Sequence, residues 1–239
     1  MAKKDIVLFG EQHNSAIAHW LQLTFTQQMA AKRKVQLGAE MIEADNQAAL
    51  NLYLADSITQ KGLDTSARLW PNYKTDYAPL VDFAKNNKLS FTGTNIPRRY
   101  ASLVYRSGFA ALDTLPKLEQ SWIAPLPIAF DATLPTYQSI LKMMGAHGTP
   151  ELVMAQASKD ATMAHFILKD YIPGNLFIHY NGAFHSDYYE GILWYLQRQS
   201  PNLKYGTIST VTQADISNLD PKHKGKADFI IVVDEAMTK

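Results

Sequence analysis

The sequence predicts an α/β protein with an open, mainly parallel β-sheet that is flanked by helices. Two observations support this fold class. Short apolar runs alternate with helical patterns at both ends of the chain, and the stretch at about 97–171 contains no strand pattern. Alternating strands and helices are typical of βαβ units, in which the strands are parallel. We therefore expect one α/β domain over residues 1–239, with a mainly helical insertion at about 97–171 above the carboxyl ends of the strands.

Hydrophobic periodicity assigns the individual elements. Strands are expected at 5–9, 35–39, 89–94, 176–180, 205–211 and 228–233. Helices are expected at 15–32, at 45–56, at 76–87, from Pro150 to near Tyr171, and at 187–199. Asn14 can cap the first helix, because its side chain can accept a bond from a free backbone N–H. The aromatic stretch 62–74 has no clear period and is expected to be irregular.

Composition excludes several classes of protein. Lys and Arg together number 23 against 22 acidic residues, a net charge of +1, whereas nucleic-acid binders carry a basic excess. No nucleic-acid partner is therefore expected. The absence of cysteine excludes disulfides, thiolate catalysis and zinc fingers. The chain begins Met1-Ala2-Lys3-Lys4 and enters a strand without a signal segment or lipobox cysteine, which leaves a cytoplasmic protein and a mature exported form both open.

Two Gly-x-x-His motifs each follow a predicted strand. They are Gly10 to His13 and Gly182 to His185, and Glu11 lies inside the first motif. Glu40 follows another strand. The carboxyl ends of parallel strands meet at one edge of a sheet, so these groups are expected to form one site.

The four titratable residues, Glu11, His13, Glu40 and His185, suit two kinds of chemistry. They could hold a divalent metal such as Zn, Mn or Fe, or act in general acid–base catalysis. The alternative is that both histidines only cap helices or bond backbone groups. The sequence favours a site, because two such motifs and a third strand-end acid coincide.

Further polar residues lie near the same edge. Arg98 and Arg99 follow the strand at 89–94 and could bind a carboxylate or a phosphate. Asp160 shares an apolar helical face with Gln156 and Met163, so it needs a partner, and we expect a salt bridge to Arg98 or Arg99. 

Aromatic residues, a methionine pair and one charged run complete the candidates. Trp70, Tyr73, Tyr77 and Tyr100 suit either a large flat ligand with carboxylates or a buried flank with bonded hydroxyls; residue types alone favour the flank. Met143 and Met144 are expected in the core rather than in a pocket. His165 is either exposed or directed at a ligand. The basic run at 222–226 is expected to be a solvated loop.

At these residues the chain resembles the ChaN-like haem-binding proteins. The resemblance is carried by 8–14, 37–41, 70–80, 95–98, 155–156 with 160–164, and 181–185. It implies an iron-regulated bacterial lipoprotein of haem uptake, with an α/β fold, a helical subdomain, and haem held between two subunits by a tyrosine. Tyr77 is the expected iron ligand and Tyr73 the reserve. The other expected haem-contacting residues are Arg98, Arg99, Tyr100, His165 and Met163.

The resemblance also implies a setting. A homodimer is expected when haem is loaded, with an outer-membrane haem uptake system as partner and a periplasmic or membrane-anchored location. The paired motifs are also similar to those of the TraB/TIKI and erythromycin-esterase hydrolases, whose TIKI members use a divalent metal. The leading prediction is therefore a haem-binding protein of bacterial iron acquisition, and the alternative is a metal-dependent esterase or peptidase that uses Glu11, His13, Glu40 and His185.

Overall fold

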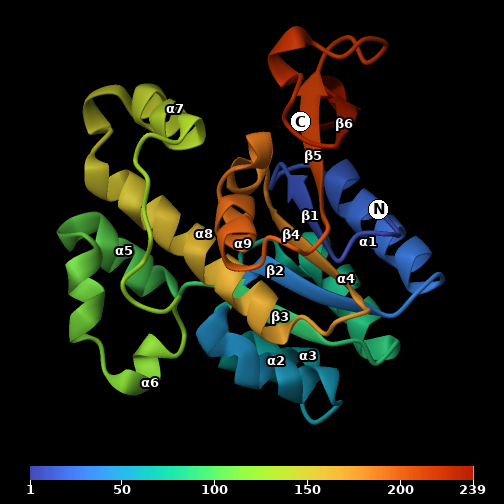
Figure 1. The fold of residues 1–239 in the computed structure, drawn as a ribbon. Coiled ribbons are helices and arrows are strands. Elements are labelled where there is room, and N and C mark those ends of the chain that lie inside the picture. Colours follow the sequence, from blue (N-terminus) through green and yellow to red (C-terminus); the bar gives the residue numbers. More distant parts are fainter. Residues whose placement is uncertain (239) are drawn as a thin grey trace.

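A six-stranded parallel sheet forms the centre of the molecule in the computed structural model, which describes residues 1–238 (Figure 1). The strands are β1 (Ile6–Glu11), β2 (Val35–Glu43), β3 (Phe91–Asn95), β4 (Leu176–Gly182), β5 (Tyr205–Gln213) and β6 (Phe229–Asp234). Their order is β3-β2-β4-β1-β5-β6, and every neighbouring pair is parallel. The predicted fold class is confirmed.

Nine α-helices connect and cover these strands within the described residues. They are α1 (Ala16–Ala30), α2 (Gln47–Leu54), α3 (Gln60–Ser66), α4 (Ala78–Asn86), α5 (Arg98–Ser107), α6 (Lys117–Gln120), α7 (Pro135–Met144), α8 (Pro150–Asp170) and α9 (Ile192–Gln199). The expected helices and strands are present, and their ends differ by a few residues. The prediction that 62–74 is irregular is wrong in part, because α3 and a π-helical turn at Tyr73–Tyr77 lie there.

Two helix starts differ from expectation for local reasons. Ser15, and not Asn14, caps α1, because its side chain accepts the N–H of Ala18. The helix expected at 187–199 begins only at Ile192. Tyr188 and Gly191 have φ angles of 59° and 54°, in the left-handed region that a right-handed helix cannot accommodate.

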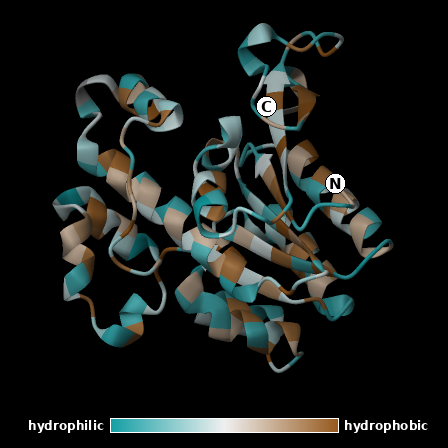
Figure 2. Ribbon diagram, in the orientation of Figure 1, coloured by the Kyte–Doolittle hydropathy of each residue, from teal (hydrophilic) through white to brown (hydrophobic). Residues whose placement is uncertain are grey.

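Apolar side chains pack on both faces of the sheet, so hydrophobic segments run through its centre (Figure 2). Residues of α1 to α4 cover one face, where they pack on Val7, Phe9 and Leu37. Residues of α5, α8 and α9 cover the other face, around Leu8 and Phe177. Burial on both faces explains why the strands read as continuous apolar runs in the sequence.

The stretch at 97–171 is a helical insertion, as predicted. Its long helix α8 packs against β3, α5 and α9, whereas α7 lies out from the sheet and is attached through Tyr137, which packs on Val153 and Ala157 of α8 (Figure 1). No helix of residues 1–238 has both the length and the apolar character needed to cross a bilayer.

Candidate functional site

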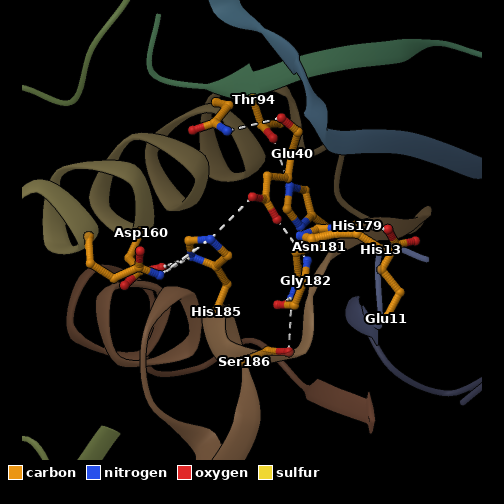
Figure 3. Close-up of polar contacts among 12 residues, drawn as sticks. Glu11, His13, Glu40, Thr94, Asp160, His179, Asn181, Gly182, His185 and Ser186 are labelled. Atoms are coloured by element: carbon orange, nitrogen blue, oxygen red, sulfur yellow. Dashed lines mark hydrogen bonds and ion pairs between the residues drawn. The ribbon is translucent and has the colours of Figure 1, made fainter. Parts of the chain in front are cut away.

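The four predicted titratable residues come together at the carboxyl ends of β1, β2 and β4 (Figure 3). Parallel pairing places Glu11 beside Gly182, and Glu40 lies within β2. Gly182 is the centre of the group. Its N–H donates to Glu40 Oε2 at 2.7 Å, and a Cβ atom on it would lie 2.6 Å from His13 Nε2. A side chain here would collide with His13, which explains the glycine of the second motif.

His185 lies between two buried carboxylates. Its Nε2 is 3.2 Å from Glu40 Oε1, and its Nδ1 is 2.5 Å from Asp160 Oδ1. Burial alone would lower the pKa of His185, but the charges of Glu40 and Asp160 raise this pKa to about 10. Burial opposes ionisation of Glu40 as well, yet the charge of His185 holds the pKa of Glu40 far below its usual value. His185 is therefore an imidazolium at neutral pH.

The buried carboxylate of Asp160 has other partners than those predicted from the sequence. The predicted salt bridge to Arg98 or Arg99 is wrong, because Asp160 binds His185 and accepts the Tyr137 hydroxyl at 2.8 Å. Arg99 instead binds Asp45 at 2.6 Å. Asp160 does have partners on its apolar helical face, as expected, but helical spacing did not identify which residues they are.

Glu11 orients His13 through a hydrogen bond. Its Oε1 accepts from His13 Nδ1 at 2.8 Å and from the Tyr77 hydroxyl at 2.8 Å, and its Oε2 accepts from Gln22 at 2.6 Å. Burial would raise the pKa of Glu11, but the bonds from His13 and His19 lower it. 

His13 is the accessible member of the group, since 42% of its side chain is exposed. Burial would lower the pKa of His13, but its bond to Glu11 and the charge of Glu40 raise it. A carboxylate that orients an accessible imidazole is an arrangement suited to proton transfer.

An open cleft adjoins this group and has two lobes. We call the lobe of about 450 Å³ beside α5 the outer lobe, and the lobe of about 500 Å³ beside β4 and β5 the inner lobe. Both lobes are lined by His13, Glu40 and Lys159. Each volume is in the range of small-molecule sites.

The two lobes differ in their walls. The outer lobe is lined mainly by Trp70, Asn95, Arg98, Ser102, Tyr105 and Leu152. The inner lobe is lined mainly by Ile140, Met143, Phe184, Thr210, His223 and Lys226. Each lobe therefore combines apolar surface with cationic side chains.

The tyrosines expected to bind haem are buried away from both lobes. Tyr77 donates to Glu11, and Tyr73 lies in the core beneath α4. Burial, followed by the charge of Glu11, raises the pKa of Tyr77, and burial also raises the pKa of Tyr73. Tyr100 is buried too and donates to Glu119.

The other expected haem-contacting residues are scattered. Arg98 lines the outer lobe. Arg99 is engaged by Asp45, Met163 is fully buried in the core, and His165 packs edge-on against Phe166 outside the cleft. Met143 is 63% exposed and lines the inner lobe, and Met144 is 44% exposed, so the expectation that the pair lies in the core is wrong.

Sequence reasoning missed three residues of the site. Tyr105 and Lys159 line the cleft, and Tyr137 binds Asp160. Helical spacing could have found the first two. On α5 the lining residues include Arg98, Ser102 and Tyr105, and on α8 they are Leu152, Ala155 and Lys159, in both cases at steps of three and four. Nothing in the sequence pointed to Tyr137.

The predicted metal ligands use their polar atoms on one another. Both ring nitrogens of His185 face carboxylates, and Nδ1 of His13 faces Glu11. Across residues 1–238, no three His, Asp or Glu side chains are arranged to hold a metal ion. The divalent-metal alternative therefore has no support from the geometry.

Comparisons with known proteins agree with this fold. The family model for haem-binding uptake proteins of the Tiki superfamily, ChaN, matches residues 1–196. The solved structure of cofacial haem binding to ChaN of Campylobacter jejuni is similar at a TM-score of 0.70 and 17% identity, covering 96% of this chain and 87% of that one. No curated protein sequence matches the chain.

More distant structures share the architecture. The type III effector HopBA1 matches at a TM-score of 0.51 and 13% identity, over 98% of this chain and 89% of that one. An erythromycin esterase variant in its open conformation matches at a TM-score of 0.52 and 11% identity, over 88% and 71% of the two chains. At such identities these likenesses show the fold alone.

Proposed function

The chain belongs to the ChaN family of haem-binding uptake proteins in the Tiki superfamily, and from this premise we propose that it binds haem in the cleft above the sheet. The observation that carries the proposal is the family match over residues 1–196. The cleft supports it, because residues of β1 to β5 and of the helical insertion line it and it has room for a flat ligand.

The walls of the cleft suit the chemistry of haem. Trp70 and Phe184 offer aromatic surface for the apolar ring, while Arg98 and Lys159 offer positive charge for its carboxylates. No ion pair or hydrogen bond of the described structure engages the side chains of Arg98 or Lys159, whereas Arg99 is committed to Asp45. When bound, haem supplies an iron that needs a ligand from the protein.

We propose Tyr105 as that ligand. It lines the outer lobe and is 46% exposed. The prediction that Tyr77 or Tyr73 binds iron stays untested, but the geometry disfavours both. Their hydroxyls are buried, and burial raises both pKa values, which opposes the tyrosinate that ferric haem prefers.

The setting implied by the resemblance remains part of the proposal. Loading with haem would join two copies of the chain, because an exposed flat apolar ligand is stabilised when a second surface covers it. Met143 on α7 is exposed and lines the inner lobe, and Met144 beside it in the sequence is exposed as well, so α7 supplies apolar surface for such a contact. A role in iron transport, an outer-membrane uptake system as partner, and a periplasmic or lipid-anchored location complete this proposal.

Titration with haemin tests the haem proposal. We expect a saturable shift of the Soret band for the wild type, and a change in band position with at least tenfold weaker binding for Tyr105→Phe. Tyr189→Phe is the matched control, since Tyr189 is similarly exposed and lies outside the outer lobe. Light scattering of the loaded and unloaded protein tests dimerisation.

Two results would contradict parts of the proposal. A wild type without a saturable Soret shift would reject haem binding. If the haemin spectrum is unchanged by Tyr105→Phe but changes in the double variant Tyr73→Phe and Tyr77→Phe, one of the two buried tyrosines binds the iron and Tyr105 does not.

Hydrolysis is the second candidate function, and one observation favours it. His13 is accessible, is oriented by Glu11, and lies beside the cleft as a general base would. His185 is unsuited to that role, because it is already protonated at neutral pH. An esterase and peptidase panel with His13→Gln tests the idea, which fails if no wild-type activity is found or if the variant retains it.

A further inference from the structure

The inner lobe contains polar atoms that the protein itself leaves unused. Among the described residues, Thr210 Oγ1 is buried without a hydrogen-bond partner, and His223 lies against the backbone of Thr212, which leaves one of its two ring nitrogens available. Thr210 is only 1% exposed, and both residues line the inner lobe. A buried donor without a partner destabilises a fold, so its presence needs a ligand or water as explanation.

The ammonium group of Lys226 belongs to the same lobe and is held in place by an ion pair. Lys226 lines the same lobe and donates to Asp187 Oδ2 at 2.8 Å, while Asp187 Oδ1 accepts from Ser209 at 2.6 Å. The basic run was expected to be a solvated loop, which holds for the exposed Lys222. It is wrong for His223 and Lys226, which are half-buried against the cavity.

Part of the lining of the inner lobe is apolar. Phe184 is 51% exposed, and it lines the lobe together with Met143 and Ile140. Apolar side chains and hydrogen-bond donors in one cavity suit a ligand that has an apolar ring and an oxyanion at its edge. The lobe is therefore shaped for an amphipathic molecule and not for a free ion alone.

We infer that Thr210, His223 and Lys226 form a carboxylate-binding subsite, and that it takes a propionate group of the bound porphyrin. This inference rests on the proposed haem function. A singly charged carboxylate suits the subsite better than a phosphate dianion, because Asp187 already balances the positive charge of Lys226. The hydroxyl of Thr210 and one N–H of His223 supply the remaining donors.

A pair of matched variants on β5 separates ligand binding from folding. Thr210 and Thr207 are both 1% exposed, but Thr207 Oγ1 accepts the N–H of Asp228 at 3.0 Å, whereas Thr210 Oγ1 has no partner. Thr210→Val is therefore expected to leave the urea midpoint unchanged or higher, and Thr207→Val to lower it. Porphyrin binding should be weakened by Thr210→Val and unchanged by Thr207→Val.

The binding assay compares haemin with haemin dimethyl ester, whose propionates carry no charge. We expect the wild type to bind the free acid about tenfold more tightly, and Thr210→Val to reduce this preference to about twofold. Thr207→Val should keep the tenfold preference. Inorganic phosphate without porphyrin is the third probe, read out as a shift of the thermal midpoint.

Each result has a distinct meaning. Equal binding of acid and ester by the wild type, or an unchanged preference in Thr210→Val, overturns the subsite while haem binding stands. Stabilisation by phosphate that Thr210→Val abolishes, without an acid-to-ester preference, also overturns the propionate assignment. Absence of any haemin binding overturns the proposed function and this inference with it.

Discussion

The protonated His185 between Glu40 and Asp160 predicts that stability falls as pH rises above neutrality. The pKa of His185 is about 10 in the folded protein against an ordinary value of 6.5. Because the folded state keeps a proton that the unfolded chain releases above pH 6.5, the free energy of unfolding decreases between pH 6.5 and 10. The contribution is complete below pH 6.5 and is lost as pH approaches 10.

The size of this effect follows from the shift. One pH unit corresponds to about 1.4 kcal/mol for one proton, so the interval from pH 6.5 to 9 gives a loss of up to about 3 kcal/mol. That is a substantial part of the roughly 5–15 kcal/mol that stabilises a typical domain. Restricting the measurement to pH 9 keeps most lysine and tyrosine titrations outside the interval.

Urea unfolding followed by circular dichroism at several pH values tests this prediction. His185→Gln should be less stable at pH 6.5 and should lack the decrease, and Asp160→Asn should show a smaller one. His165→Gln is the matched control, because His165 is half-buried and makes no ion pair with Glu40 or Asp160. A flat wild-type profile between pH 6.5 and 9, or an equal slope in His185→Gln, would refute the buried imidazolium.

Three further predictions concern other residues of the site. Glu11→Gln should lower the pKa of His13, because it removes the charge that raises this pKa, and an NMR titration of the His13 ring measures the change; an unchanged titration would contradict the pairing. Gly182→Ala should move the NMR resonances of the His13 ring, because the new methyl group displaces this half-exposed side chain. The loss of unfolding free energy should stay below about 1 kcal/mol, since φ at Gly182 is −58°, an angle that alanine adopts readily. Unmoved resonances would contradict the contact. Tyr137→Phe should lower the unfolding free energy by about 2 kcal/mol, because Asp160 loses a buried donor; urea unfolding measures this, and no loss would show that the bond is unimportant.

Much of the fold was readable from the sequence because its signals are local. Apolar runs such as Ile6–Leu8 and Leu176–Ile178 are buried on both faces, and they alternate with helical patterns whose order requires parallel pairing. The gathering of Glu11, His13, Glu40 and His185 followed from that topology alone. Helix ends were less certain, since Tyr188 and Gly191 adopt backbone conformations that no periodicity reveals.

The finer structure of the site depends on contacts between segments far apart in the chain. Asp160 needed a partner, but the choice of His185 over Arg98 is set by where α8 crosses the sheet. The buried position of Tyr77 depends on the π-helical turn at 73–77, which the aromatic composition of that stretch does not specify. The unused hydroxyl of Thr210 becomes visible only once its neighbours are placed.

The position of His185 has a consequence for the mouth of the cleft. Glu40 belongs to β2 in the sheet, and Asp160 belongs to α8 in the insertion, so the two walls are joined through one charged ring (Figure 3). Moving α8 away from the sheet would separate opposite charges in a water-poor interior, which costs far more than sliding apolar surfaces apart. The two ion pairs of the protonated His185 therefore hold α8 against the sheet, and a ligand enters a cleft whose walls are already in place.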